Sequence, residues 1–154
     1  MVKNSIILEI EKLLDNKKIL DYNILSDSFG INCLKIETED KKRYIVKYYY
    51  KKQGRFNAIK SEADNLFFLN TLKFNFFPKI INNNNKFLIM SFIDNNNNLP
   101  IKTNGDLLDA IISLHSKKSN NYGFNFDTQI GGLKQPNSRS KNWVEFYRDK
   151  RLCY

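Results

Sequence analysis

The stretch that most constrains the fold runs from Arg43 to Tyr50 and is rich in aromatic and β-branched side chains. This composition, bounded by charged runs, is typical of a β-strand. Because side chains alternate along a strand, every second residue lies on the same face. One face carries Ile45, Lys47 and Tyr49, and the other carries Tyr44, Val46 and Tyr48. Burying a lysine in mid-strand is costly unless an anionic group meets it, so Lys47 needs a partner.

The candidate partner for Lys47 is Glu62, in the next segment of the chain. Glu62 borders a stripe of apolar residues at helical spacing, formed by Ile59, Ala63, Leu66 and Leu69. A strand lysine paired with a helix glutamate beside a phosphate site is the arrangement that nucleotide kinases use. The alternative is an edge-strand lysine over solvent and a solvated glutamate. Both interpretations stay open on these residues alone, because a Val-Lys strand followed by a helical glutamate is common.

Composition narrows the class of protein. The 154 residues suit one domain with a real core, and no apolar run is long enough to span a bilayer. The net charge is +9, but the lysines are spread along the chain among asparagines and acidic residues. We therefore expect neither a nucleic-acid nor a membrane partner. Two cysteines, Cys33 and Cys153, fit no metal spacing and no disulfide framework, which favours a reducing cytoplasm.

The pattern up to residue 38 predicts a helix and two strands. Residues 5–16 have apolar side chains at helical spacing, with Asn4 or Ser5 as the expected cap. The predicted strands cover residues 19–25 and 31–38. The loop between them contains Ser28, Phe29 and Gly30, where a kinase-type fold would cover the phosphates. An ordinary hairpin turn is the alternative, because this loop has a single glycine.

After the Lys47 strand, a helix is predicted over residues 57–72, followed by a hairpin of residues 79–81 and 87–93 around four asparagines. The order is then helix, three strands, helix, two strands. We expect an α+β fold in which residues 1–93 form the small lobe of a protein-kinase-like structure, a five-stranded antiparallel sheet plus a helix. Another α+β sandwich with the same order is the alternative.

The end of the last predicted strand would become the hinge of such a fold. Met90 would lie at the back of an adenine pocket, with the Ser91 carbonyl and the Ile93 amide facing the adenine edge. Residues 94–98 are polar and favour a linker, and a helix with Thr103 or Asn104 as cap would run to His115. Residues 94–154 are thus expected to hold the hinge linker and the start of a second lobe. His115 is interpreted as structural.

Five short motifs in the last third of the chain occur together. They are Tyr122-Gly123-Phe124, Thr128 to Gly132, Gln135-Pro136-Asn137, Trp143 to Tyr147, and Arg151-Leu152. In order and spacing they resemble the fructosamine kinase (ketosamine 3-kinase) family. The run from Arg43 to Lys47 in the predicted strand and the run from Glu62 to Leu66 in the predicted helix are similar to that family as well.

The resemblance implies a protein-kinase-like fold that transfers the ATP γ-phosphate to the 3-hydroxyl of a sugar attached to an amine. ATP and Mg²⁺ would be the cofactors. The acceptor would be a small ketosamine or a glycated protein, and the outcome would be protein deglycation. Lys47 would then contact the ATP phosphates, with Glu62 as its partner.

Two departures from the family pattern bear on activity. The phosphate loop keeps one glycine, Gly30, and the sequence has no His-Gly-Asp catalytic loop. We therefore expect a small lobe followed by the first helices of a truncated large lobe, with no catalytic residue and no metal ligand among these residues. An inactive nucleotide-binding remnant and a kinase for another small hydroxylated amine are the alternatives.

The polar stretch from Ile130 to Trp143 is expected to be a loop near the substrate. Gln135, Asn137 and Trp143 are its candidate substrate-side residues. The same side chains could instead satisfy loop backbone and pack on the preceding helix, and the residues alone leave the two interpretations equal.

Overall fold

A computed structural model describes residues 2–52, 54–74, 76–95, 105–131 and 133–153. The chain divides into two compact units, each treated by itself below. The first comprises Met1–Phe92 with Thr128–Lys134, and the second comprises Ile93–Asp127 with Gln135–Tyr154. Residues 96–98 of the predicted linker and the predicted caps Thr103 and Asn104 lie outside the described residues.

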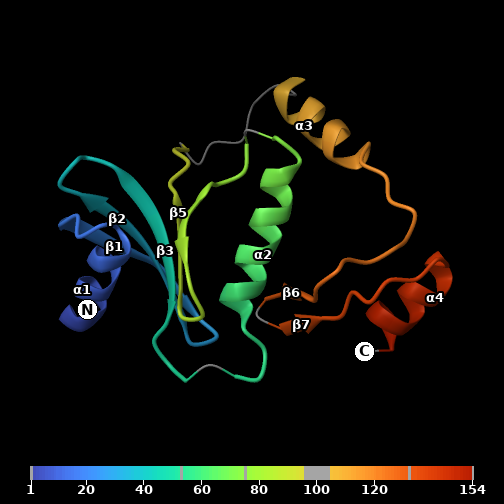
Figure 1. Cartoon of the computed structure of the whole chain (residues 1–154), viewed down its shortest axis with the longest axis horizontal. Helices are drawn as coiled ribbons and strands as arrows, with labels where there is room; N and C mark the ends of the chain where they lie inside the picture. The colour runs from blue at the N-terminus through green and yellow to red at the C-terminus, as the bar shows by residue number, and fades with distance from the viewer. Residues whose placement is uncertain (1, 53, 75, 96–104, 132, 154) are drawn as a thin grey trace. The chain divides into compact units, whose positions relative to one another are not determined.

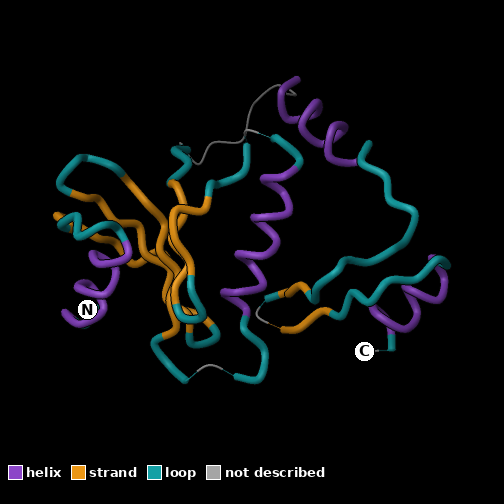
Figure 2. The backbone as a smooth tube through the Cα atoms, in the orientation of Figure 1, coloured by secondary structure: helices purple, strands orange, loops and turns teal. Residues whose placement is uncertain are grey.

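The first unit is built on a five-stranded sheet with the order β1-β2-β3-β5-β4, in which every neighbouring pair is antiparallel (Figures 1 and 2). The strands are β1 (Ile19–Ser28), β2 (Ile31–Thr38), β3 (Arg43–Tyr49), β4 (Ile80–Asn83) and β5 (Phe87–Ser91). Helix α1 (Asn4–Leu13) covers one face and α2 (Ala58–Thr71) covers the other (Figure 1). The predicted α+β sheet with its helix is confirmed.

Strand β3 shows the predicted alternation. Tyr44, Val46 and Tyr48 are buried in a cluster with α1, while Ile45 and Tyr49 pack against the cluster under α2. Because β3 lies between β2 and β5, both of its edges are paired with a neighbouring strand. Lys47 shares the α2 face, so the interpretation of an edge-strand lysine is wrong.

Helix α1 differs from the prediction at both ends. It begins at Asn4 with Lys3 as N-cap and no side-chain cap bond, so the expected capping by Asn4 or Ser5 is wrong. It ends at Leu13, three residues early, because Asp15 and Asn16 adopt left-handed backbone angles, φ 57° and 62°.

Glu11, which is buried, ties the end of α1 to β1. It accepts hydrogen bonds from the Ile19 N–H at 3.0 Å and the Lys18 ammonium at 3.0 Å. These two donors hold the pKa of Glu11 below its ordinary value, against the opposing effect of burial.

The hairpin between β1 and β2 is tighter than predicted. The strand predicted to end at Leu25 continues to Ser28, which pairs with Ile31. Only Phe29 and Gly30 form the turn, with φ of 52° and 76°. Two left-handed residues match the twist of the flanking strands, so pairing persists to the turn. A role for Ser28, Phe29 and Gly30 over phosphates stays a prediction.

The remaining elements of the first unit follow the pattern closely. The Asn57 side chain caps α2 by accepting from the Lys60 N–H, and α2 ends one residue before the predicted boundary. Strand β4 extends into the asparagine run, where Asn82 and Asn83 pair with β5, and the Asn82 amide also donates to the Leu13 carbonyl. The Asn84 side chain then accepts the N–H groups of residues 86 and 87 to form the turn.

The second unit contains helix α3 (Gly105–His115), helix α4 (Trp143–Tyr147) and one π-helical turn, η1 (Arg148–Leu152). Strands β6 (Thr128–Ile130) and β7 (Leu133–Gln135) form a small hairpin, so the expectation of a plain loop from Ile130 onward is wrong. Most of this hairpin, through Lys134, belongs to the first unit, where β6 contacts α2.

Several family-like motifs of the last third meet at Asn137, whose side chain is 1% exposed. Its Oδ1 accepts from Arg151 Nη2 at 2.6 Å, and its backbone N–H donates to Asp127 Oδ1 at 3.0 Å. Its carbonyl accepts the Phe124 N–H at 2.9 Å. Arg151 also lies over the Phe146 ring at 4.7 Å. The motifs therefore form one structural centre of the second unit.

Gly123 is required by this centre. Its φ is +96°, and a Cβ built there would lie 2.5 Å from the Asn137 carbonyl oxygen and 3.0 Å from the Phe146 ring. No other residue type combines that backbone angle with that close approach.

Replacing Gly123 by alanine should destabilise the second unit, since it adds left-handed strain to a clash with backbone. We expect the free energy of unfolding to fall by roughly 2–4 kcal/mol. Thermal unfolding followed by Trp143 fluorescence measures it. Gly105→Ala is the control, because a Cβ at Gly105 meets nothing within 4 Å. Equal unfolding curves for the two variants would contradict this account.

Candidate functional site

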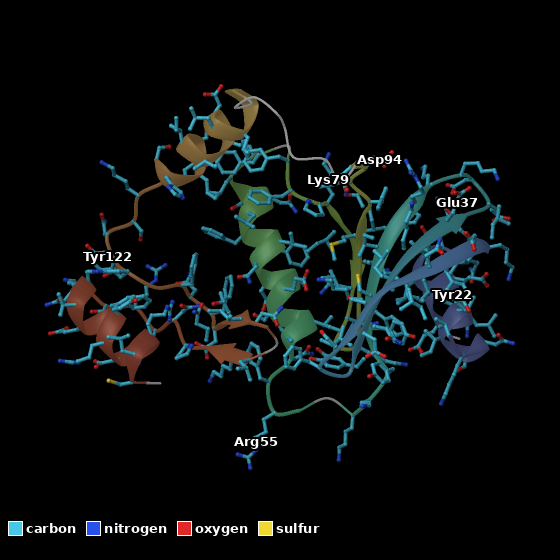
Figure 3. The ribbon with its side chains drawn as sticks, turned by 180° about the vertical axis from the view of Figure 1, so that it is seen from behind. Tyr22, Glu37, Arg55, Lys79, Asp94 and Tyr122 are labelled. Carbon is cyan, nitrogen blue, oxygen red and sulfur yellow. The ribbon has the colours of Figure 1, made fainter. Side chains whose placement is uncertain are left out.

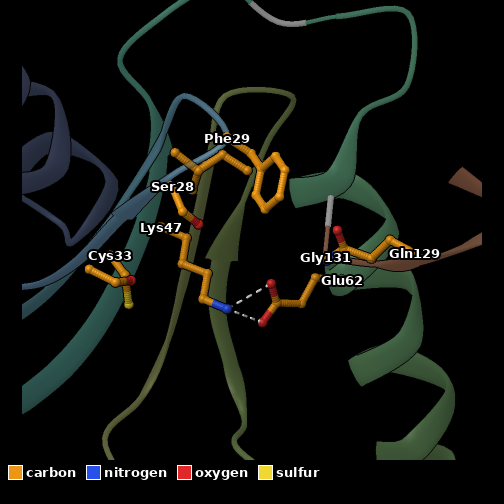
Figure 4. Close-up of a pocket in the computed structure, with 9 residues that line it drawn as sticks. Ser28, Phe29, Cys33, Lys47, Glu62, Gln129 and Gly131 are labelled. Atoms are coloured by element: carbon orange, nitrogen blue, oxygen red, sulfur yellow. Dashed lines mark hydrogen bonds and ion pairs between the residues drawn. The ribbon is translucent and has the colours of Figure 1, made fainter. Parts of the chain in front are cut away.

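A cavity of about 260 Å³ opens on the α2 side of the sheet, within the first unit (Figure 4). It draws side chains from the β1–β2 hairpin, β3, α2 and the β6–β7 hairpin. The lining residues are Ser26, Ser28, Phe29, Ile31, Cys33, Lys47, Glu62, Gln129 and Gly131. The cavity thus holds the lysine and the glutamate to which the sequence pointed.

Lys47 and Glu62 form a two-pronged ion pair across this cavity. Lys47 Nζ lies 2.6 Å from Oε1 and 2.8 Å from Oε2 of Glu62 (Figure 4). Their side chains are 29% and 25% exposed, so the pair is partly shielded and still reachable by a solute. Two short charge-assisted bonds fix the lysine stem over the sheet. The predicted pair is confirmed.

Strand register places a row of polar side chains beside Lys47. Ser26 on β1 is opposite Cys33 on β2, which in turn is opposite Lys47 on β3. Ser28, two residues beyond Ser26, is on the same face and also lines the cavity. Two hydroxyls and an ammonium on one wall are the donor set that an oxyanion prefers.

Phe29 forms the tip of the hairpin over the cavity (Figure 4). Its side chain is 70% exposed and its backbone is left-handed. Both features are unfavourable for a phenylalanine. Gly30, the third predicted residue of the phosphate loop, is not among the lining residues and packs against Lys51.

The predicted hinge residues do not line this cavity. Met90 is buried in the cluster under α2. The Ser91 N–H donates to the Lys79 carbonyl at 2.8 Å, and its hydroxyl accepts the Lys79 N–H at 2.9 Å. Ile93 follows β5 and is 47% exposed. Contact of these three residues with adenine stays a prediction.

The substrate-side candidates belong to the second unit or its border. Asn137 is buried and hydrogen-bonded to Asp127 and Arg151 of the same unit, which agrees with the structural interpretation of this residue. Trp143 is 50% exposed and packs its ring on Tyr122 and Tyr147, each 5.4 Å away. Gln135 ends β7 and is half-buried. A role for any of them toward a substrate stays a prediction.

Sequence reasoning missed Cys33, Gln129 and Gly131 as lining residues of the cavity. The Thr-Gln-Ile-Gly-Gly run was visible as a motif, but nothing in its pattern showed that β6 packs on α2. Register could have identified Cys33, because it is opposite Lys47 in the antiparallel pair of β2 and β3. Gly132, the last residue of the motif, lies outside the described residues.

The family model described as fructosamine kinase matches residues 7–154 of this chain. The chain belongs to the fructosamine kinase family.

Two curated relatives match parts of this family member. A probable ketoamine kinase of Pasteurella multocida is 30% identical over 101 residues, covering 62% of this chain and 35% of that protein. A chloroplastic protein-ribulosamine 3-kinase of Arabidopsis thaliana is 36% identical over 70 residues, covering 44% of this chain and 21% of that protein. The matched stretch therefore spans about a third or less of either relative.

Solved structures show the same fold. A candidate fructosamine-3-kinase from Thermobifida fusca aligns with a TM-score of 0.78 at 19% identity, covering 98% of this chain and 52% of that one. A second, from Haemophilus somnus, aligns with a TM-score of 0.73 at 20% identity, covering 96% and 50%. The chain spans about half the length of each, with the kinase-like fold of the family.

The cavity of this family member fits phosphate groups better than it fits a metal ion. Lys47, Ser26 and Ser28 supply donors for phosphate oxygens. Of the lining residues that the structure describes, Glu62 is the single carboxylate, and it is already paired with Lys47. Across the described ranges, no group of three or more histidine, cysteine or acidic residues could hold a metal ion. The described lining residues therefore do not fit Mg²⁺.

Cys33 offers a probe of the charges in the cavity. Burial raises the pKa of the Cys33 thiol, while the Lys47 ammonium lowers this pKa and the Glu62 carboxylate raises it. Because the thiolate is the reactive form, alkylation of Cys33 should need a higher pH than that of an ordinary cysteine. We expect Lys47→Met to move the midpoint of the rate upward in pH and Glu62→Gln to move it downward.

The measurement is the rate of iodoacetamide labelling against pH in a Cys153→Ser background, which removes the exposed cysteine. If neither substitution moves the midpoint, the charges of Lys47 and Glu62 do not affect the pKa of the Cys33 thiol.

Proposed function

We propose that the first unit binds ATP in the Lys47–Glu62 cavity, and that the chain supplies the nucleotide-binding part of a ketosamine 3-kinase. The observation that carries this proposal is the two-pronged ion pair within a cavity whose other polar lining groups are donors. In kinases, a strand lysine held by a helix glutamate neutralises the phosphates and positions them for transfer. The hydroxyls of Ser26 and Ser28 would add to Lys47 on the phosphate side.

The remaining contacts of the nucleotide follow from the same proposal. Ser28, Phe29 and Gly30 would act as the phosphate loop, and the adenine would lie toward Met90, Ser91 and Ile93. Residues 1–93 would be the small lobe, and residues 94–154 the hinge and the start of the second lobe. Mg²⁺ would be held mainly by groups other than the described residues.

The acceptor class is inferred from the names of the relatives. One is named a ketoamine kinase and another a protein-ribulosamine 3-kinase. We infer that the whole protein phosphorylates the 3-hydroxyl of a ketosamine, either small or attached to a protein, and so contributes to deglycation. Two free cysteines, Cys33 and Cys153, agree with a reducing cytoplasm. In the part of the chain that is described, none of the helices has the length and apolar character needed to cross a membrane.

A second candidate is a nucleotide-binding remnant without activity. One observation favours it, the single glycine, Gly30, in the predicted phosphate loop. Both candidates require a working ATP site, and Mg-ATP binding to the wild type and to Lys47→Met tests that site. The family-like motifs around Asn137 favour a ketosamine kinase over a kinase for another small hydroxylated amine.

Lys47→Met should weaken Mg-ATP binding at least 10-fold, because Lys47 supplies the single ammonium among the described residues that line the cavity. Isothermal titration calorimetry of the wild type and the variant measures the dissociation constants. Lys60→Met is the matched control. The Lys60 side chain is exposed, pairs with Asp64 on the same helix and does not line the cavity. If Lys47→Met binds Mg-ATP like the control, the nucleotide does not use this cavity.

The 154-residue polypeptide alone should show no ketosamine phosphorylation above background. Its sequence supplies no carboxylate loop to orient the acceptor hydroxyl, and losing that group typically costs about 10²–10⁴-fold in rate. The assay is transfer of labelled γ-phosphate to fructosyl-lysine. Turnover that Lys47→Met abolishes would contradict this expectation and place the catalytic carboxylate within these residues.

A further inference from the structure

Tyr49, the last residue of β3, is hydrogen-bonded to the start of helix α2. Its hydroxyl oxygen accepts the backbone N–H of Ala58 at 2.9 Å. Ala58 is the first residue of α2, so this N–H has no acceptor within the helix. The chain leaves β3 and reaches this end of α2 through the connector that carries Arg55 (Figure 3). The Tyr49 hydroxyl therefore joins the strand directly to the helix that follows it.

This hydrogen bond has the same spacing as the Lys47–Glu62 ion pair. Tyr49 is two residues beyond Lys47 on the same face of β3, and Ala58 is four residues before Glu62 on α2. Two residues of a strand span about 7 Å, and four residues of a helix span about 6 Å. The two contacts therefore lie side by side between one strand and one helix, and together they fix the register of α2 on β3.

Apolar packing alone does not fix this register. Ile59 and Leu66 hold the buried stripe of α2 on the sheet, but apolar burial is non-directional. Tyr49, Phe56 and Ala58 line a cavity of about 330 Å³, which leaves room for this end of α2 to shift. A directional bond is therefore needed to hold the first turn of α2 in one position.

A second hydrogen bond at this end of α2 leads to a different pair of strands. The Asn57 amide donates to the Asn85 carbonyl at 2.9 Å, in the turn between β4 and β5. This bond holds the helix to the turn of that hairpin. The Tyr49 bond, in contrast, joins the helix to the strand that carries Lys47.

We propose that Tyr49 is a positioning residue of the Lys47–Glu62 cavity. Its hydroxyl fixes the register of α2 on β3 and so keeps the Glu62 carboxylate on the Lys47 ammonium. Without that hydroxyl, the first turn of α2 would shift, and Glu62 would hold Lys47 for a smaller fraction of the time. This inference rests on the proposed function in one respect, because it gives Tyr49 a part in presenting Lys47 to the ATP phosphates.

Cys33 reports the position of Glu62 without any nucleotide. It is opposite Lys47 in the β2–β3 pair and lines the same cavity. Burial raises the pKa of the Cys33 thiol, the Lys47 ammonium lowers this pKa, and the Glu62 carboxylate raises it. If Glu62 leaves Lys47, the pKa of the thiol should therefore fall. We expect Tyr49→Phe to lower the pH midpoint of iodoacetamide labelling in the Cys153→Ser background, in the same direction as Glu62→Gln.

A second readout follows the lysine itself. The ammonium protons of Lys47 exchange with water more slowly while two short bonds to Glu62 hold them. We expect this exchange, measured by ¹⁵N-resolved NMR, to be about 5-fold faster in Tyr49→Phe, the change that loss of one hydrogen bond typically causes. The variant keeps the aromatic ring, so the first unit should remain folded, and far-UV circular dichroism checks this.

Tyr50→Phe is the matched control. The Tyr50 hydroxyl donates to Asp27 at 2.6 Å, and Tyr50 is not among the described lining residues of either cavity. We expect this control to keep the wild-type midpoint and the wild-type exchange rate. The double variant Tyr49→Phe with Glu62→Gln should have the same midpoint as Glu62→Gln alone, because Tyr49 acts through Glu62.

Two outcomes would overturn the role of Tyr49. One is a Tyr49→Phe variant with the midpoint and the exchange rate of Tyr50→Phe. The other is a double variant in which the two shifts of the midpoint add, since Tyr49 would then act on Cys33 independently of Glu62.

Titration with Mg-ATP separates this inference from the proposed function. If the wild type binds Mg-ATP while Tyr49→Phe changes neither readout, the role of Tyr49 alone is wrong. If the wild type does not bind Mg-ATP, the proposed function is wrong. The labelling and exchange measurements need no nucleotide, so they still decide whether Tyr49 positions Glu62.

Discussion

The ion pair between Lys47 and Glu62 is the constraint on which the first unit depends. β3 is an interior strand, so a lysine on it must be compensated on whichever face it occupies. The alternation that buries Tyr44, Val46 and Tyr48 against α1 places Lys47 on the opposite face. Helix α2 must therefore present a carboxylate to that face. Asn57 caps the start of α2, and Glu62 lies within hydrogen-bond distance of Lys47. One charge requirement thus links the register of β3, the position of α2 and the cavity between them.

The second unit depends on a different interaction, the buried amide of Asn137. Segments that are separated in the sequence are joined there by hydrogen bonds from Arg151 and Phe124, with Gly123 leaving room for the Asn137 carbonyl. A buried polar group is stable only when its hydrogen bonds are satisfied. Arg151 donates to the side-chain oxygen of Asn137, and the Phe124 N–H donates to its backbone carbonyl. The motifs that mark the family in this region therefore have structural roles that require no part in catalysis.

Much of the fold could be predicted because its signals are local. Alternation identified β3, the apolar spacing around Ile59 and Leu66 identified α2, and together they placed Glu62 beside Lys47. Features set by backbone angle or distant contact could not be predicted. Phe29 carries no sign of a left-handed turn, so Ser26 and Ser28 looked like loop rather than strand. The packing of β6 on α2 joins residues more than fifty positions apart, and nothing in the sequence from Thr128 onward predicted it.

The most direct test of this account is a crystal structure of the chain with a non-hydrolysable ATP analogue. The account predicts phosphate oxygens within hydrogen-bond distance of Lys47 Nζ and of the Ser26 or Ser28 hydroxyl, with Glu62 still bound to Lys47. An analogue bound elsewhere on the first unit, with the Lys47–Glu62 cavity free of phosphate, would contradict it.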